Sequence, residues 1–476
     1  MKWTGLTFFL FLLALLLKVL SVHFSYDTFL LVGSDGPYYP LQVRAIIERG
    51  ELAFADMPLL FWLEALVAKL LISSGIPQQK AIIWTNQTVP ALLSSLAIFP
   101  VAAFARDLQE KPSIPILIVR LFALFNISTM HAFPASLLHK NAVAVSLIFT
   151  FLYYGRRAML NGDRTNWALA SLFLVLCALT HFGSFAFLLL FSFVFVWINQ
   201  RKSRQMSGKN IGWFGMLLLL SLGLLWVFDV ERFERLLFLP TRLFSHSLAS
   251  KLVSGQPMQQ YVNPINYISS LVLFAVGVML WQKVKRRLGE IDRRIGLTAI
   301  WTSFILLLPV LGIEWTSRAQ MLAFIPLSIL YILTFSVEKA FRYTILSQLL
   351  LTGVICLAIL SAFLSKMEAI TVEAYAEYGK VQRAVSFPEH ALLIGRQDLR
   401  LLGSWEWGCQ NMSDLRWMND SPKPAQPTFL IRQIAGSRLT GRRFRQMSIP
   451  ASAKEVFAGS YLKLYQLEQA TADESD

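Results

Sequence analysis

Residues 34–40 read Ser-Asp-Gly-Pro-Tyr-Tyr-Pro and come soon after the first long apolar run, Leu6–Leu20. Asp35 is therefore placed where an apolar helix would leave a bilayer, with Tyr38 and Tyr39 close behind it. A carboxylate there can activate an acceptor hydroxyl, and aromatic rings with polar tips can bind a sugar face or a phosphate. The stretch predicts a membrane enzyme. Two other interpretations stay open, because Ser-Asp-Gly-Pro also suits a turn and a Tyr pair also suits the aromatic belt of a membrane protein.

The composition is that of a membrane protein. The chain has 476 residues, of which 55% are hydrophobic and only 15% are charged, and this is too apolar for an ordinary soluble domain. Apolar runs long enough for helices of roughly 20 residues recur along the chain, without the alternating pattern of a barrel. The first of them, Trp3–Leu20, is followed by no small-x-small cleavage site and is expected to remain as a signal anchor. We expect an α-helical polytopic protein with about eleven transmembrane helices.

The distribution of charge predicts the orientation. The net charge of +15 would suggest a nucleic-acid partner in a soluble protein, but here the basic residues gather in short linkers between apolar runs. The positive-inside rule assigns such linkers and the N-terminus to the cytoplasm, so we expect an integral protein of the plasma or inner membrane and no nucleic-acid partner. Outer loops are then expected to contain Asp35, His131–Lys140, Asp229–Pro264 and Glu314–Arg318.

One segment must not cross the membrane if this orientation is to hold. Residues 58–73 carry Glu64 and Lys69, and they are short for a span. We expect them to form a helix along the outer surface, within an outer loop at 23–82.

The composition changes after about residue 365, and this predicts two domains. Residues 1–365 hold the long apolar runs and are expected to form the transmembrane domain. Residues 366–476 carry only short apolar runs separated by Gly, Pro and Asn, which are typical of strands and turns. These runs are His390–Gly395, Thr428–Ile431 and Tyr461–Leu467. We expect a small extracytoplasmic α/β or α+β domain.

The outer loop carries a resemblance to a known superfamily. Asp35 stands ahead of Tyr38 and Tyr39, a helical run follows at 45–50, and Asp56 precedes a Pro-Leu helix. This order resembles the start of the GT-C fold glycosyltransferases, which include protein O-mannosyltransferases, lipid A aminoarabinose transferases and oligosaccharyltransferase catalytic subunits. The resemblance implies transfer of a sugar from a polyprenyl-phosphate donor to a glycan, lipid or protein acceptor. The transfer would take place among membrane lipids at the outer face of the cell envelope.

The resemblance also implies roles for individual residues. Asp35 would be the catalytic base, and Arg318, in the late outer turn 314–318, would hold the donor phosphate together with Tyr38 and Tyr39. Chemistry of this kind needs a carboxylate for the nucleophile and a cation for the phosphate leaving group.

The second outer loop departs from the pattern of that superfamily. Many relatives place a second acid there, but residues 130–141 contain no carboxylate. Three explanations compete. His131, His139 or Lys140 would bind the phosphate in place of a metal; Asp56 or Glu51 would supply the second acid; or the fold would lack the transfer chemistry. A Mg²⁺ or Mn²⁺ ion is thus a possible cofactor with unknown ligands.

Two further residues are candidates for the central cavity. Glu314 opens the late outer turn, and His181 lies between two apolar runs at a depth where ionisable groups are often functional. The alternative for His181 is that it caps a tight helical hairpin through Thr180 and Ser184.

The alternative function is a transporter or flippase for lipid-linked glycans, or a non-catalytic scaffold. No Walker A, Rossmann or HExxH motif occurs, which argues against a nucleotide-sugar donor or an ATP-driven cycle. Inverted repeats would favour transport, and none is visible in the sequence.

Overall fold

The described part of the chain is mostly helical, with one small sheet near the C-terminus. It was obtained as a computed structural model that describes residues 3–25, 36–108, 139–200, 219, 223, 226–227, 264–308, 313–335, 372–388, 391–411, 426–434 and 449–467. Asp35, His131 and the expected domain boundary near 365 lie outside these residues.

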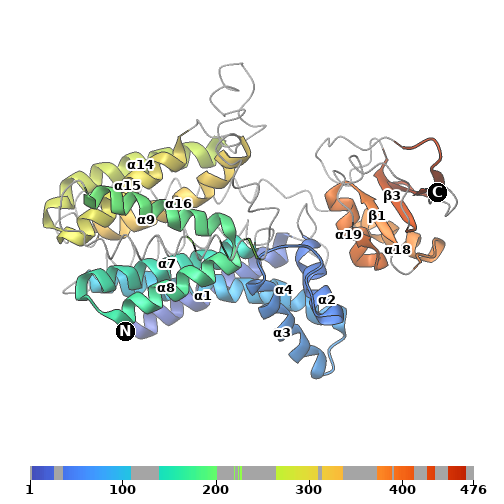
Figure 1. The fold of residues 1–476 in the computed structure, drawn as a ribbon, viewed down its shortest axis with the longest axis horizontal. Coiled ribbons are helices and arrows are strands. Elements are labelled where there is room, and N and C mark those ends of the chain that lie inside the picture. Colours follow the sequence, from blue (N-terminus) through green and yellow to red (C-terminus); the bar gives the residue numbers. More distant parts are fainter. Residues whose placement is uncertain are drawn as a thin grey trace, which may run out of the picture.

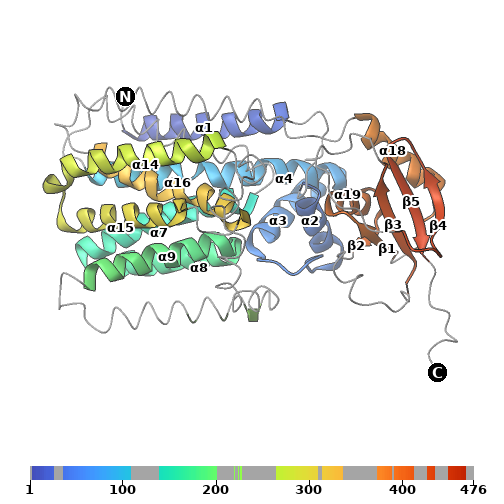
Figure 2. The same ribbon diagram turned by 90° about the horizontal axis from the view of Figure 1, so that it is seen from above.

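Most of the described helices run side by side in a bundle (Figures 1 and 2). They are α1 (Trp3–Ser25), α4 (Gln78–Ser95), α5 (Ile98–Asp107), α7 (His139–Asn161), α8 (Arg164–Thr180), α9 (Phe182–Gln200), α14 (Pro264–Val284), α15 (Glu290–Leu307) and α16 (Ile313–Phe335), with a 3₁₀ turn η2 (Lys285–Arg287) after α14. Within the described ranges, three segments are long and apolar enough to cross a membrane, namely Gln78–Asp107, His139–Asn161 and Phe182–Asn199. These three segments are compatible with membrane association.

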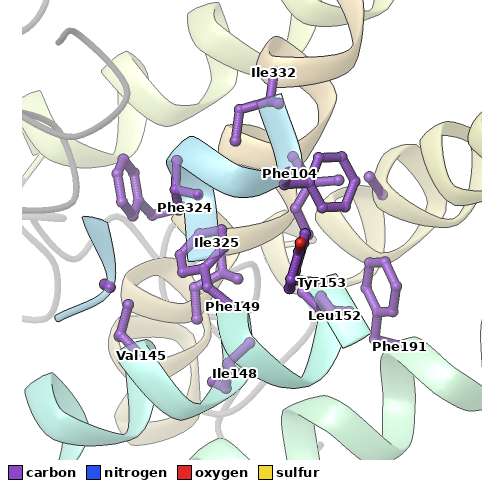
Figure 3. Close-up of a cluster of buried hydrophobic side chains, with 14 of the residues drawn as sticks. Phe104, Val145, Ile148, Phe149, Leu152, Tyr153, Phe191, Phe324, Ile325 and Ile332 are labelled. Atoms are coloured by element: carbon purple, nitrogen blue, oxygen red, sulfur yellow. The ribbon is translucent and has the colours of Figure 1, made fainter. Parts of the chain in front are cut away.

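The centre of the bundle is an apolar core. Phe104 of α5, Phe149 of α7, Phe191 of α9 and Phe324 of α16 belong to one buried cluster (Figure 3). The outer faces of several bundle helices carry large apolar side chains, such as the exposed Phe8 of α1 and Phe193 of α9. Water-soluble proteins rarely expose wide apolar surfaces, so these outer faces suit a lipid environment.

A buried ion pair fixes α7 to α15. The Arg156 guanidinium donates from Nε to Asp292 Oδ1 at 2.6 Å and from Nη2 to Oδ2 at 3.0 Å. It also lies over the Phe104 ring, 5.1 Å from the ring centroid. Because this fork-like geometry tolerates little displacement, the pair sets the register between the two helices.

Two other helices, α2 (Tyr38–Arg49) and α3 (Leu59–Ser73), lie between the bundle and the sheet (Figures 1 and 2). Helix α2 begins after Pro37 and ends at Gly50, whose φ of 78° is a left-handed conformation that glycine adopts without strain. Helix α3 begins after Pro58 and packs on α4 after a short turn. In both views α3 runs obliquely to the long helices.

The exposed face of α3 is apolar. Trp62, Leu66 and Leu70 are exposed, whereas Glu64 is buried against α4. The buried face also carries apolar residues such as Phe61 and Ala65, so α3 is apolar on both sides, whereas a helix on the surface of a water-soluble protein has a polar outer face. The helix predicted over 58–73 is present, and its outer side chains suit lipid better than water.

The C-terminal elements form a five-stranded mixed sheet with two helices. Its strands are β1 (Leu392–Gly395), β2 (Gln410–Asn411), β3 (Thr428–Gln433), β4 (Lys454–Ala458) and β5 (Leu462–Leu467), and its helices are α18 (Val372–Ala384) and α19 (Gln397–Trp407). The strand order is β2-β1-β3-β5-β4, with β1 parallel to β2 and β3, and β5 antiparallel to β3 and β4. The three strands predicted from apolar runs correspond to β1, β3 and β5.

Helix α2 is joined to α19 by an arginine. Arg44 donates from Nη1 to the carbonyl oxygen of Trp405 at 2.8 Å and from Nη2 to that of Ser404 at 2.9 Å. Its guanidinium also lies over the Trp405 ring, 5.2 Å from the ring centroid. These carbonyls belong to the last turn of α19, which ends at Gly408, and a helix C-terminus favours a cation.

Helices α2 and α3 share a hydrophobic core with the C-terminal domain. Ile46 of α2 and Phe61 of α3 are fully buried in one cluster with Tyr378 of α18 and Leu402 of α19. The sheet domain and the helices α2 and α3 therefore bury apolar surface against one another.

Two predictions about loops were wrong. Residues 314–318, expected as an outer turn, form the first turns of α16, because the chain has no Gly or Pro between Ile313 and Pro326 and an acidic residue is favourable near a helix N-terminus. His139 and Lys140, expected in an outer loop, are the first residues of α7.

Candidate functional site

A buried carboxylate lies at the centre of the candidate site. Asp56, in the connection between α2 and α3, accepts a hydrogen bond on Oδ2 from the Tyr38 hydroxyl at 2.5 Å. The ammonium group of Lys140 forms an ion pair with the same oxygen. The backbone N–H of Met57 donates to Oδ1 at 2.7 Å. Asp56 therefore joins α2 to the first turn of α7, 84 residues away in the sequence.

Aromatic rings surround the ion pair. The Lys140 ammonium lies 5.3 Å from the ring centroid of Phe61 and 5.8 Å from that of Tyr38, which are cation–π distances. Next to it, the Tyr39 and His139 rings stack with centroids 4.3 Å apart. The structure thus brings together four of the predicted phosphate-binding residues and one of the two predicted second acids.

A glutamine positions the tyrosine and the loop that carries Asp56. The fully buried Gln42 follows Tyr38 by one helical turn and donates from Nε2 to the Tyr38 hydroxyl oxygen at 3.1 Å. Its amide also pairs with the backbone of Phe54, with Nε2 3.0 Å from the carbonyl oxygen and Oε1 3.1 Å from the N–H nitrogen. The loop before Asp56 is therefore fixed to α2 by a side chain that imitates a backbone pairing.

Replacing Gln42 with leucine is expected to lower the free energy of unfolding by about 1–3 kcal/mol, because the Phe54 amide and carbonyl would lose their buried partner. Chemical unfolding in lipid-detergent mixtures would measure the change. Gln78→Leu is a matched control, since Gln78 makes an exposed hydrogen bond to Glu48. Equal stability of the Gln42→Leu and Gln78→Leu proteins would contradict the positioning role.

The remaining predicted residues lie elsewhere or outside the described ranges. Glu51 is exposed in the loop after α2, so the structure favours Asp56 over Glu51 as the acid of the site. The side chains of Glu314 and Arg318 are not described, and neither are Asp35 and His131.

His181 caps a helix, which is one of the two roles that the sequence suggested for it. Its Nδ1 lies 2.9 Å from the Ser184 hydroxyl and accepts the Ser184 backbone N–H at 3.1 Å. The side chain thereby caps the start of α9, as polar residues at helix N-termini do. Thr180 takes no part in the cap, because its hydroxyl donates to the Leu176 carbonyl at 2.7 Å.

No family model matches this chain, and no curated protein matches it. Its function has to be inferred from its own residues.

The site as described does not fit a divalent metal. Across the described ranges, no three His, Cys, Asp or Glu side chains gather as metal ligands. The one carboxylate of the cluster is paired with Lys140, whose positive charge would repel a second cation. We therefore assign no step to Mg²⁺ or Mn²⁺.

The burial of two polar residues was not predicted from the sequence. Gln42 and Glu64 both lie on helix faces that pack against other elements. The available signal for Gln42 was its position four residues after Tyr38, which places both side chains on one face of α2.

Proposed function

We propose that this protein is an integral membrane glycosyltransferase that moves a sugar from a polyprenyl-phosphate donor to a glycan, lipid or protein acceptor at the outer face of the membrane. The single observation that carries the proposal is the cluster of Tyr38, Tyr39, Asp56, His139 and Lys140. It combines a buried cation, an imidazole, phenolic hydroxyls and aromatic faces in one place.

These groups suit the charge that develops when a sugar leaves a lipid phosphate. As the bond between the anomeric carbon and the phosphate oxygen breaks, the electron pair stays on the phosphate, and Lys140 and His139 are placed to stabilise it. Asp56 holds the ammonium in position, and its Tyr38 hydrogen bond limits rotation of the carboxylate. Asp35, three residues before Tyr38, is the proposed base that takes the proton of the acceptor.

The proposal includes a polytopic arrangement of about eleven transmembrane helices, with the N-terminus cytoplasmic and residues 366–476 outside. In this arrangement α3 lies on the outer surface of the bilayer, with Trp62, Leu66 and Leu70 in contact with lipid. Its oblique direction relative to the bundle supports this placement (Figure 2).

Asp35→Asn is expected to lower sugar transfer by about 10²-fold or more, because it removes the proposed general base. The purified protein in lipid nanodiscs would be supplied with a mixture of polyprenyl-phosphate sugars, and sugar release and transfer would be measured. Glu51→Gln is the control and should keep full activity, because Glu51 is exposed and outside the cluster.

The same assay separates the alternative functions. Turnover in the wild type that is lost only in Asp35→Asn supports the transferase. Absence of turnover and of donor binding in both proteins would overturn it and favour a non-catalytic scaffold. Movement of the intact donor across liposome membranes without transfer would favour a flippase.

A further inference from the structure

A carboxyl group is buried where α3 packs on α4. The Glu64 side chain has no exposed surface, and the Asn86 amide donates to its Oε2 at 3.0 Å. Among the described residues, Glu64 Oε1 has no hydrogen-bond partner, and no cation pairs with the carboxyl group. A carboxylate in such surroundings would be costly, whereas a neutral carboxylic acid would be tolerated.

Apolar side chains from three helices pack together one helical turn away from Glu64, Asn86 and Lys140. Leu60 comes one turn before Glu64 on α3, Val89 comes one turn after Asn86 on α4, and Val143 comes one turn after Lys140 on α7. These three side chains form a buried cluster of their own. Since Lys140 is already paired with Asp56, it does not supply the positive charge that an ionised Glu64 would need.

The other described charged side chains near α3 do not balance a negative charge on Glu64 either. Arg44 of α2 binds the carbonyls of α19, and Glu48 of α2 accepts a hydrogen bond from Gln78. The remaining charged side chains on α3 and on the helices that pack against it are exposed: Arg49 on α2, Lys69 on α3, Lys80 on α4 and Arg164 on α8.

We infer that Glu64 is a proton-binding site that holds α3 against α4, so that loss of the proton loosens the interface and moves the first turn of α3. That turn carries Phe61 against the Lys140 ammonium and begins at Leu59, soon after Asp56 in the chain. The candidate site is therefore complete only while Glu64 is protonated. The inference does not depend on the proposed transferase activity.

The direction of the pH dependence follows from burial. Burial raises the pKa of Glu64 well above its ordinary value, and the Asn86 hydrogen bond lowers it by less. The folded protein then keeps this proton to higher pH than the unfolded chain does. Its stability is complete below the ordinary carboxyl range and falls as the pH rises toward the folded-state pKa, by up to about tenfold in the folding equilibrium per pH unit.

The test compares the full-length wild type with Glu64→Gln in lipid nanodiscs, with Glu51→Gln as an exposed-carboxylate control. Infrared spectra at neutral pH are expected to show a protonated carboxyl band that is absent in Glu64→Gln and present in Glu51→Gln. Unfolding measured from acidic to alkaline pH should show the falling stability in the wild type and in Glu51→Gln, and Glu64→Gln should abolish that slope.

Asn86→Ala gives a second readout, because removal of the hydrogen bond that lowers the pKa should extend the loss of stability to higher pH, with its onset unchanged. Three results would overturn the inference: no infrared band that depends on Glu64, an unchanged pH slope in Glu64→Gln, or failure of Glu64→Gln to fold at neutral pH. An amide matches a neutral carboxylic acid in size and polarity, so it must be accepted at a site that holds a protonated acid.

Discussion

Replacing Lys140 with methionine is expected to lower the free energy of unfolding by about 3–5 kcal/mol, because it leaves the Asp56 carboxylate buried without its counter-charge. Asp56→Asn should have a comparable effect, since it leaves the Lys140 ammonium buried. The double variant Asp56→Asn/Lys140→Met should recover most of the loss, because neither charge then remains in the interior. Unfolding in lipid-detergent mixtures, followed by circular dichroism, would give the three free energies.

This cycle separates the structural role of the pair from its chemical role. Lys69→Met, on the exposed side of α3, is the control for loss of a lysine and should change stability little. If Lys140 binds the donor phosphate, the double variant should be stable yet inactive with polyprenyl-phosphate sugars. A double variant that is both stable and fully active would leave the pair with a structural role only, and single variants as stable as the wild type would contradict the ion pair itself.

Replacing Glu377 with alanine is expected to destabilise the C-terminal domain by about 3 kcal/mol or more, since three buried or partly buried N–H groups would lose their acceptor. The Glu377 carboxylate, on α18, accepts from the backbone nitrogens of Ser460, Tyr461 and Leu462 at 2.5, 2.9 and 2.8 Å. It thereby fixes α18 to the turn between β4 and β5. Hydrogen exchange of residues 459–462 in the full-length protein would report the loss directly.

Two further variants test the contact between Glu377 and the turn that joins β4 to β5. Glu373→Ala, an exposed position on the same helix, is the control and should leave exchange at the turn unchanged. Gly459→Ala should reproduce the effect of Glu377→Ala, because an added methyl group would overlap the Glu377 carboxylate. Unchanged protection of the turn in Glu377→Ala would show that the strand pairing alone holds it.

Local sequence patterns predicted where helices and strands lie better than they predicted which elements contact one another. The apolar runs in the last quarter of the chain predicted β1, β3 and β5, but β2 has only two residues, and the apolar run of β4 is limited to residues 456–458 after two charged residues. The helix over 58–73 was predicted within one residue of α3 at its start. Such features depend on neighbours in the sequence, which a pattern can report.

The candidate site was predicted in part. Residue types and the resemblance indicated Tyr38, His139 and Lys140, and they left Asp56 and Glu51 as alternatives. Only the contact of Asp56 with Lys140 of α7, and the exposure of Glu51, distinguish the two. Gln42 was not singled out, and Glu64 was interpreted as a sign of a surface helix, for one physical reason. A polar residue in an amphipathic helix is ordinarily read as facing solvent, and only tertiary contacts show that these two face inward.

The contact of Arg44 with the end of α19 makes the C-terminal domain inseparable from the helix that carries Tyr38 and Tyr39. A protein truncated before α18 would leave Ile46 and Phe61 without their apolar cover, in a form prone to aggregate. For the same reason, a chimera that receives a foreign C-terminal domain would need matching side chains on α2. An exchange of domains would therefore have to carry α2, α3 and the C-terminal domain together.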